Sequence, residues 1–305
     1  MSRILVLGRT GQVASELAAA AWPTALKPVF AGRPEFDMTR PETLEPLLEQ
    51  EAPAVVINAT AYTDVNRAEK EREVAFAVNR DGPARLAALC RRHGLPLLHI
   101  SSDYVFSGAK PEPYLEEDPP DPLNIYGESK AAGEAAVRAV WSRHIILRTS
   151  WVYSAHGSNF VKTMLGLGRE RNEVRMVADQ WGAPTAAADI AATLIEIAET
   201  VAGREDAPWG TYHYTGGGGA ITWHELAEHI FEAQEQATGR RPSLIAIATA
   251  DYQTPARRPA NSRLDCSRLE RVFGIAGRPW RQGVDRVLST LLHSEAAVVS
   301  ACDDR

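Results

Sequence analysis

The chain has 305 residues, of which 45% are hydrophobic and 24% are charged, so it can bury a sizeable core. Its formal net charge of −6 at pH 7 excludes the clustered positive surface of a nucleic-acid-binding protein. Three widely separated cysteines, Cys90, Cys266 and Cys302, cannot build a disulfide framework or a cysteine metal knuckle. The sequence shows no signal peptide and no apolar run long enough to cross a membrane, which predicts a cytoplasmic protein.

The first half of the chain alternates short apolar runs with helical stretches. We expect helices over residues 12–21, 42–51, 75–93 and 130–140. We expect strands over residues 4–7, 29–31, 54–58, 97–101 and 145–148. Strands that are apolar along their length are typical of parallel sheets buried between two layers of helices. The pattern therefore predicts an α/β fold with a doubly wound parallel (Rossmann) sheet, whose ligand lies at the carboxyl ends of the strands.

The regular alternation ends near residue 150. Beyond it, glycine and proline cluster at 182–184, 216–219 and 255–259, and helices are predicted over 189–200 and 222–238. We therefore predict a nucleotide-binding domain over residues 1–150 and a smaller substrate-binding lobe over residues 151–295, partly interleaved with the first. The segment 110–122 is rich in proline and acidic residues, which predicts a loop, either a lid at the substrate edge or a plain surface loop.

A glycine-rich turn joins the first predicted strand to the first predicted helix. It reads Gly8-Arg9-Thr10-Gly11-Gln12-Val13-Ala14. The two glycines let the backbone turn tightly and approach a phosphate group, and the helix N-terminus supplies unpaired N–H groups. At the first turn of a strand–helix–strand unit, this spacing predicts a dinucleotide site made by Gly8, Thr10, Gly11, Gln12 and Val13.

The end of the second predicted strand bears on the choice of dinucleotide. An acidic residue there would bind the ribose 2′-hydroxyl of NADH, whereas an arginine would accept the 2′-phosphate of NADPH. The strand ends in Ala31-Gly32-Arg33, without an acid at its tip. Arg33 favours NADPH unless it is a solvated surface residue, and Asp37 is a candidate for the adenine end. On this evidence the cofactor is either NADPH or NADH.

Tyr126 and Lys130 are four residues apart, so they share one face of a helix. We expect the Lys130 ammonium to lower the pKa of the Tyr126 phenol and to hydrogen-bond the nicotinamide ribose. Ser102 follows the fourth predicted strand, where its hydroxyl faces the same cleft and can hold a substrate oxygen. This set is typical of a reductase in which Tyr126 donates the proton. We therefore predict Ser102, Tyr126 and Lys130 as the catalytic residues.

Several longer motifs occur in order along nearly the whole chain. They are Asn58-Ala59-Thr60-Ala61-Tyr62-Thr63-Asp64-Val65, Ser101-Ser102-Asp103-Tyr104-Val105-Phe106, Asn124-Ile125-Tyr126-Gly127-Glu128-Ser129-Lys130, Arg148-Thr149-Ser150-Trp151-Val152-Tyr153, Asp179-Gln180-Trp181-Gly182-Ala183-Pro184-Thr185 and Arg258-Pro259-Ala260-Asn261-Ser262-Arg263-Leu264. With these motifs the chain resembles the dTDP-4-dehydrorhamnose reductases of the extended short-chain dehydrogenase/reductase superfamily. The resemblance implies NAD(P)H-dependent reduction of the C4 keto group of dTDP-4-dehydro-L-rhamnose to dTDP-L-rhamnose.

The same resemblance implies further site residues and an assembly. Around the cofactor it places Thr10, Gly11, Gln12, Val13, Asp37, Met38, Ala61, Tyr62 and Thr63, with Tyr126 and Lys130. Around the dTDP-deoxyhexose substrate it places Ser102, Asp103, Tyr104 and Trp151. The flat ring of Trp151 suits the C–H face of a hexose, although a buried core tryptophan is the other interpretation. The resemblance also implies a homodimer.

The resemblance further implies a Mg²⁺ ion held by glutamates at a dimer interface. Glu16 matches one of these positions. The second carboxylate is missing, because Ala188 stands at the corresponding position with Asp189 beside it. We therefore expect no metal site, and any Mg²⁺ held by Glu16 would be structural rather than catalytic.

Three other functions share this fold. The 4,6-dehydratases need two adjacent carboxylates after the strand-end hydroxyl, but here Asp103 is followed by Tyr104. A nucleotide-sugar epimerase would lack the tryptophan-containing and Arg-Pro-Ala-Asn-Ser segments, and another nucleotide-sugar reductase stays an alternative. The regulatory subunit of methionine adenosyltransferase binds NADP and acts as a partner protein, without turning over a sugar. The intact set of Ser102, Tyr126 and Lys130 favours an enzyme.

Overall fold

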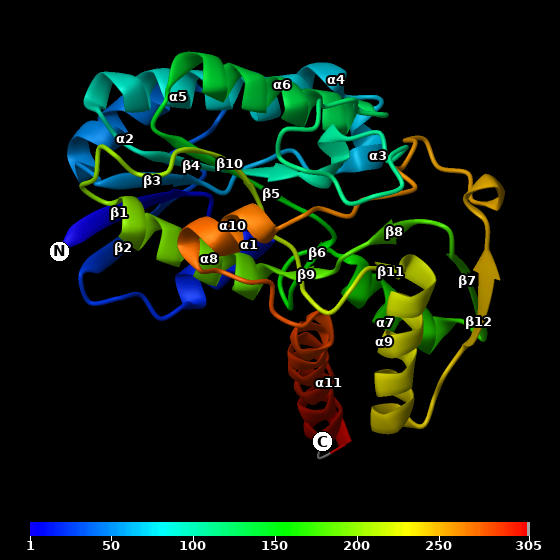
Figure 1. Cartoon of the computed structure of the whole chain (residues 1–305). Coiled ribbons are helices and arrows are strands. Elements are labelled where there is room, and N and C mark those ends of the chain that lie inside the picture. The colour runs from blue at the N-terminus through cyan, green and yellow to red at the C-terminus, as the bar shows by residue number, and fades with distance from the viewer. Residues whose placement is uncertain (304–305) are drawn as a thin grey trace.

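Six parallel strands form the central sheet, in the order β2-β1-β3-β4-β5-β10 (Figure 1). In the computed structural model, which describes residues 1–303, they are β1 (Ser2–Leu7), β2 (Leu26–Ala31), β3 (Val55–Asn58), β4 (Leu97–Ser102), β5 (His144–Thr149) and β10 (Gly210–His213). The chain places β2 on one side of β1 and β3 on the other. This reversal creates a crevice at the carboxyl ends of β1 and β3 and confirms the predicted doubly wound fold.

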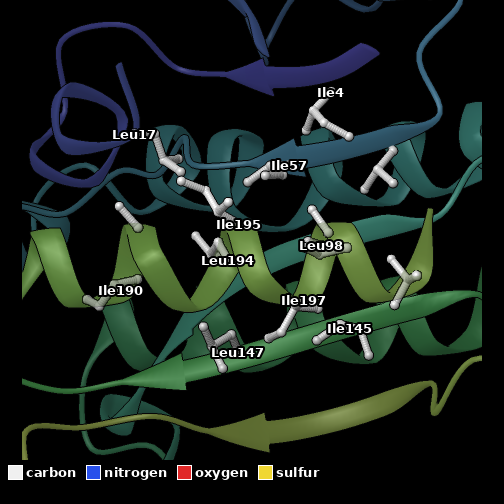
Figure 2. Packing of buried hydrophobic residues seen from close by; sticks show 14 of the residues in the cluster. Ile4, Leu17, Ile57, Leu98, Ile145, Leu147, Ile190, Leu194, Ile195 and Ile197 are labelled. Carbon is white, nitrogen blue, oxygen red and sulfur yellow. The ribbon is translucent and has the colours of Figure 1, made fainter. Parts of the chain in front are cut away.

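Helices cover both faces of the sheet because the strands are apolar on both sides. In β1, Ile4 and Val6 pack into the layer of α1 and α8, whereas Leu5 and Leu7 pack into the layer of α2, α5 and α6. Figure 2 shows the first layer, in which the apolar side chains of α8 lie against those of the strands. The helices of the two layers are α1 (Gln12–Ala19), α8 (Ala187–Val201), α2 (Leu44–Glu51), α5 (Gly82–His93) and α6 (Ile125–Val140).

The chain beyond residue 150 contributes both to these layers and to a lobe beside them (Figure 1). α8 and β10 belong to the layers of the sheet, whereas α7 (Phe160–Glu170), α9 (Trp223–Thr238) and α11 (Trp280–Asp303) share a separate apolar cluster. The other elements are α3 (Val65–Ala68), α4 (Arg72–Phe76), α10 (Ser267–Phe273), β6 (Val152–Tyr153), β7 (Glu173–Val177), β8 (Trp181–Gly182), β9 (Thr185–Ala186), β11 (Ile221–Thr222) and β12 (Ser243–Ile247). Among residues 1–303, no helix has the length and apolarity needed to cross a bilayer.

α6 begins at Ile125, five residues before the start predicted at residue 130. Asn124 starts the helix, because its side-chain oxygen accepts a hydrogen bond from the backbone N–H of Gly127 at 2.8 Å. This earlier start places Tyr126 as well as Lys130 on the helix. An asparagine three residues before Gly127 is a recognisable cap signal, which the prediction of this helix did not use.

The helix predicted over residues 75–93 is interrupted by a π turn over Ala77–Asp81, between α4 and α5. Asn79 in this turn accepts a hydrogen bond from the backbone N–H of Tyr62 at 2.8 Å and donates one to the hydroxyl of Ser129 at 2.9 Å. Gly133 of α6 lies so close that a Cβ there would overlap the carbonyl oxygen of Asn79. The π turn therefore ties the segment after β3 to α6. Such turns are frequent at functional sites.

The close approach at Gly133 predicts that Gly133→Ala lowers the free energy of unfolding. An added methyl group would force the π turn away from α6, at a cost of about 2 to 3 kcal/mol. Gly166→Ala in α7 is the matched control, because a Cβ there meets nothing within 4 Å. The control should raise stability by about 0.5 to 1 kcal/mol through helix propensity. Thermal and urea unfolding should show that the free energy of unfolding falls in Gly133→Ala and rises in Gly166→Ala. A change in the same direction in both variants would contradict the packing described.

Candidate active site

A cavity of about 500 Å³ opens at the carboxyl ends of the central strands. It lies where the strand order reverses, the position at which doubly wound proteins bind their ligands. Its lining is drawn from segments far apart in the sequence: Thr10, Gly11, Gln12, Val13, Ala59, Thr60, Ala61, Thr63, Val65, Ile100, Ser101, Ser102, Asp103, Tyr104, Tyr126, Lys130, Thr149, Ser150, Trp151, Val152, Gly157 and Ser158. The structure thus brings together residues from the predicted glycine turn, the predicted catalytic set and the predicted sugar-binding set.

The glycine turn after β1 has the geometry that a dinucleotide requires. Gly8 has a φ of +123°, and a Cβ there would lie 3.3 Å from the carbonyl oxygen of Ala59. Only glycine adopts this backbone conformation readily. α1 then begins at Gln12 without a side chain that caps its N-terminus. The first N–H groups of the helix are left for a ligand, and with the helix dipole they fit the pyrophosphate of a dinucleotide.

The loop between β6 and α7 closes over this turn, a contact that no sequence pattern indicated. The side-chain oxygen of Gln12 accepts hydrogen bonds from Ser154 Oγ at 3.2 Å and from Asn159 Nδ2 at 2.9 Å. From the same loop, Gly157 and Ser158 line the cavity. The side chain of Gln12 therefore holds the loop in place, and its backbone N–H is the group available to a phosphate.

The predicted catalytic residues reach the cavity from β4 and α6. Ser102 ends β4, and Tyr126 and Lys130 lie one turn apart on α6. Tyr126 packs edge-on against Tyr104, with ring centroids 5.5 Å apart. Gly127 permits this approach, because a Cβ there would overlap the carbonyl oxygen of Tyr104.

Burial sets the charge states of Tyr126 and Lys130. It raises the pKa of Tyr126 to about 12, and a hydrogen bond with Ser102 offsets only part of that rise. It lowers the pKa of Lys130 to about 8, while the ammonium donates a 2.7 Å hydrogen bond to the carbonyl oxygen of Ile100. The prediction that Lys130 lowers the pKa of Tyr126 is therefore wrong, because the phenolate loses its hydration. The phenol is protonated at neutral pH, which is the form that a proton donor needs.

Asp103 is a buried carboxyl group beside this set, with 2% of its surface exposed. Burial raises its pKa to about 6, although hydrogen bonds from Ser262 and Ser102 favour the ionised form. The hydroxyl of Ser102 donates to Asp103 Oδ1 at 3.0 Å. Ser262 comes from the Arg-Pro-Ala-Asn-Ser segment, so the structure connects that motif to the cavity. The sequence alone placed no residue of this motif in the site.

Trp151 lies at the border between the sheet and the lobe. Its φ of +48° is unusual for a residue with a side chain. The ring stacks on Trp223, with centroids 3.5 Å apart, and Gly182 leaves room for it because a Cβ there would overlap the ring. Trp151 is half-buried and lines the cavity, so both the sugar-binding and the packing interpretations describe part of its surroundings.

A second cavity, of about 720 Å³, lies in the lobe. Tyr104 lines both cavities. The lobe cavity combines aromatic and basic side chains: Phe160, Trp223, Tyr252, Arg171, Arg175 and Arg258. No predicted site residue other than Tyr104 lines it, because its basic and aromatic residues come from four separate segments whose proximity is tertiary.

Five predicted cofactor residues do not line the first cavity: Gly8, Arg33, Asp37, Met38 and Tyr62. Gly8 shapes the turn through its backbone. Asp37 Oδ1 accepts hydrogen bonds from the backbone N–H and hydroxyl of Thr39, at 2.9 and 2.7 Å. Met38 is buried against Gly82 at the start of α5. Arg33 and Asp37 follow β2, on the side of the crevice where the adenosine end of a dinucleotide would extend.

The carboxylates considered for a metal site have other partners. Asp189 is buried on α8 and forms ion pairs with Arg278 at 3.1 Å and Arg286 at 3.0 Å. Glu16 lies on α1 with His156 Nε2 at 4.0 Å. Within residues 1–303, no group of three or more histidine, cysteine, aspartate or glutamate side chains is arranged to hold a metal ion.

A glycine turn at the switch point of a doubly wound sheet, with a serine, a tyrosine and a lysine around the same cavity, defines an oxidoreductase of the extended short-chain type. The family described as RmlD substrate binding domain matches residues 1–293. The chain is 44% identical over 291 residues to a dTDP-4-dehydrorhamnose reductase of Sinorhizobium fredii, covering 95% of this chain and 98% of that protein. The chain belongs to the dTDP-4-dehydrorhamnose reductase family, as the motifs predicted.

Further relatives agree with this assignment. The dTDP-4-dehydrorhamnose reductase of Escherichia coli K12 is 37% identical over 298 residues, covering 96% of this chain and 99% of that protein. The crystal structure of the Bacillus anthracis dTDP-4-dehydrorhamnose reductase in complex with NADP superposes with a TM-score of 0.87 at 33% identity, covering 95% of this chain and 99% of that chain. A Thermus thermophilus UDP-glucose 4-epimerase in complex with NAD shares the fold, with a TM-score of 0.75 at 19% identity over 94% of this chain and 98% of that chain.

The buried carboxyl group of Asp103 predicts that Asp103→Asn stabilises the protein at pH 7. Its pKa of about 6 in the folded chain lies above its ordinary value of 3.8, so folding is penalised once the group ionises. Removing the charge should raise the free energy of unfolding by about 2 to 3 kcal/mol at pH 7. The gain should shrink as pH falls through 6 and vanish near 3.8, where both states are protonated.

Unfolding of Asp103→Asn across pH 4 to 8 tests this sign. Asp118→Asn is the matched control, because Lys110 Nζ lies 2.6 Å from Asp118 and the side-chain hydrogen bond from Lys110 lowers the pKa of that carboxyl group. The control should lose stability at pH 7, the opposite direction. A loss of stability in Asp103→Asn at pH 7 would contradict the desolvation described.

Proposed function

We propose that this protein reduces the C4 keto group of dTDP-4-dehydro-L-rhamnose to dTDP-L-rhamnose with NADPH or NADH. The observation that carries the proposal is the convergence of Ser102, Tyr126 and Lys130 on one cavity with the glycine turn at Gly8. Membership of the dTDP-4-dehydrorhamnose reductase family supports the substrate. The same set of residues would be unnecessary in a protein that only binds NADP as a regulatory partner.

The chemistry follows from the charge states of the site. When bound, NAD(P)H would supply a hydride to the carbonyl carbon of the sugar. The hydroxyls of Ser102 and Tyr126 would hold the carbonyl oxygen, and Tyr126 would pass its phenolic proton to that oxygen as charge develops there. A phenol with a pKa raised to about 12 keeps this proton until the oxygen becomes more basic than the phenolate. Lys130 would bind the nicotinamide ribose and stabilise the phenolate left behind.

The sugar and its nucleotide would occupy the two cavities that share Tyr104. We infer that Asp103, Tyr104 and Trp151 contact the hexose beside Ser102. The nucleoside diphosphate would extend into the lobe cavity, where Arg258 suits a phosphate and the exposed ring of Tyr252 suits a flat base. In this arrangement residues 1–150 hold the cofactor, and residues 151–295 hold most of the substrate.

The cofactor residues outside the first cavity would serve the adenosine end. Arg33, Asp37 and Met38 follow β2, which ends without the acid that an NADH-specific site would carry. Tyr62 would fix the segment after β3 that carries Ala61 and Thr63, since its N–H and carbonyl oxygen are held by Asn79 and its hydroxyl donates to Glu71 at 2.9 Å. The proposal also includes a cytoplasmic homodimer, as the family resemblance implies. Light scattering of the purified protein would test the assembly.

The assigned proton donor predicts that Tyr126→Phe loses about 10²- to 10⁴-fold in kcat, because proton transfer in the transition state is removed. Consumption of NADPH and of NADH with the ketosugar, followed at 340 nm in parallel, measures this loss and the cofactor preference. Tyr212→Phe is the matched control. Tyr212 lies on β10 and does not line the cavity, and its hydroxyl donates to the carbonyl oxygen of Pro208 at 2.7 Å. The control should keep wild-type kcat.

Two results would count against the proposal. Wild-type turnover in Tyr126→Phe would mean that another group donates the proton. A wild-type protein that binds NADPH but reduces no nucleotide ketosugar would favour the alternative of an NADP-binding partner protein.

A further inference from the structure

A third titratable residue lies on the face of α6 that carries Tyr126 and Lys130. Glu134 follows Lys130 by one helical turn, as Lys130 follows Tyr126. Lys130 is 2% exposed and Glu134 is fully buried. Charged side chains are seldom buried to this extent unless they are paired or have a function. The reaction as proposed so far does not use Glu134.

Arg148 of β5 clamps the carboxylate of Glu134 from the sheet. Arg148 Nε donates to Glu134 Oε1 at 2.9 Å and Arg148 Nη2 donates to Oε2 at 2.7 Å. Although burial alone would raise the pKa of Glu134, its hydrogen bonds and ion pair with Arg148 lower that pKa to about 2. Arg138 adds a second pair at 3.0 Å from the solvent side. Glu134 is thus a fixed negative charge at every pH at which the enzyme would work.

A buried ion pair of this kind is costly to desolvate and is often no more stable than an apolar pair of the same size. Its retention next to a catalytic residue therefore points to a task beyond stability. Lys130 is the neighbour that gains, because burial lowers the pKa of its ammonium to about 8 and the charge of Glu134 opposes that shift. The hydrogen bond from Lys130 to the carbonyl oxygen of Ile100 orients the ammonium but supplies no full charge.

The other titratable groups packed around Lys130 do not change charge between pH 7 and 10. On β4, burial keeps the pKa of His99 well below its ordinary value, so the ring is neutral. Next to β4, Asp103 has a pKa of about 6 and is already ionised. On β5, burial also lowers the pKa of His144, and Arg148 is always charged. Tyr126, with a pKa of about 12, is neutral throughout this range.

We propose that Glu134 is a positioning residue of the active site: held by Arg148, its carboxylate keeps the Lys130 ammonium charged at neutral and mildly alkaline pH. The inference rests on the proposed function in one respect, that Lys130 contacts the bound cofactor. Glu134 itself touches neither cofactor nor substrate in this account and acts through Lys130.

The test is the pH dependence of the dissociation constant of NADPH, followed by its fluorescence between pH 7 and 10. In the wild-type protein, binding should weaken as pH rises through about 8, where Lys130 loses its charge. Lys130→Met should bind NADPH weakly at every pH, without this loss of binding at alkaline pH, which we call the alkaline limb. In Glu134→Gln the midpoint of the limb should fall by about one pH unit or more, so that binding at pH 8 weakens by about fivefold or more.

Two further variants separate this effect from a loss of packing. Glu134→Gln/Arg148→Met removes both buried charges together, so it should fold even where Glu134→Gln alone leaves Arg148 unpaired and unstable. Its midpoint should still lie below that of the wild type. Glu128→Gln is the matched control on the same helix, since Glu128 forms an exposed ion pair with Arg72 at 2.8 Å. This control should keep the wild-type midpoint.

A folded double variant with the wild-type midpoint would overturn the proposal, because the pair would then serve packing alone. The proposal would also be overturned if NADPH binding to the wild-type protein did not weaken at alkaline pH. The same holds if binding to Lys130→Met still weakened there. The binding measurement also separates this inference from the proposed function. NADPH binding with the expected limb, in a protein that reduces no ketosugar, would support the role of Glu134 while contradicting the substrate assignment.

Discussion

The buried ion pair between Glu134 and Arg148 connects the catalytic helix to the sheet. Arg148 holds Glu134 with two hydrogen bonds, and its remaining Nη1 group lies 3.3 Å from both the carbonyl oxygen of Glu116 and His213 Nε2. The pair therefore joins α6, β5, β10 and the loop at residues 110–122. Removing one partner of such a pair generally costs about 3 to 5 kcal/mol, because the other charge is left buried. This contact is therefore one of those that hold α6, the helix of Tyr126, against the sheet.

Glycines let α6 come close enough for the pair to form. Gly133 faces the carbonyl oxygen of Asn79 in the π turn, and Gly127 faces the carbonyl oxygen of Tyr104. No larger residue fits at either position without displacing backbone. The helix is consequently fixed against two backbone segments, one that holds the residues after β3 and one that carries Ser102 and Asp103. The glycines and the buried charges act together to place the phenol of Tyr126 within the cavity.

The site combines three buried titratable groups whose pKa values burial shifts in different directions. Asp103 and Tyr126 are raised, and Lys130 is lowered. Each shift disfavours the charged form, so at neutral pH the charged groups of Asp103 and Lys130 lower the stability of the folded protein, whereas the neutral phenol of Tyr126 does not. The loop that Gln12 holds over the glycine turn and the stacked ring of Trp151 complete the walls. This is the arrangement expected where proton transfer must occur away from bulk water.

The sequence by itself determined the doubly wound sheet, the glycine turn at Gly8 and the roles proposed for Ser102, Tyr126 and Lys130. These features depend on local periodicity and on residues close together in the chain, which a sequence pattern records. The start of α6 at Ile125 was within reach of the same reasoning, because the Asn124 cap is a local signal. The direction of the pKa shift at Tyr126 was not, since it depends on how much water the fold removes from the phenol.

Only the tertiary structure decided which distant residues meet. It brought Glu134 to Arg148, Asp103 to Ser262 and Gln12 to Asn159. No periodicity marks such pairs, because each joins side chains from separate elements whose approach depends on helix packing. The same is true of the lobe cavity, whose aromatic and basic lining is assembled from several segments. The sequence motifs identified the reacting groups, whereas tertiary packing determines their charge states and shields them from water.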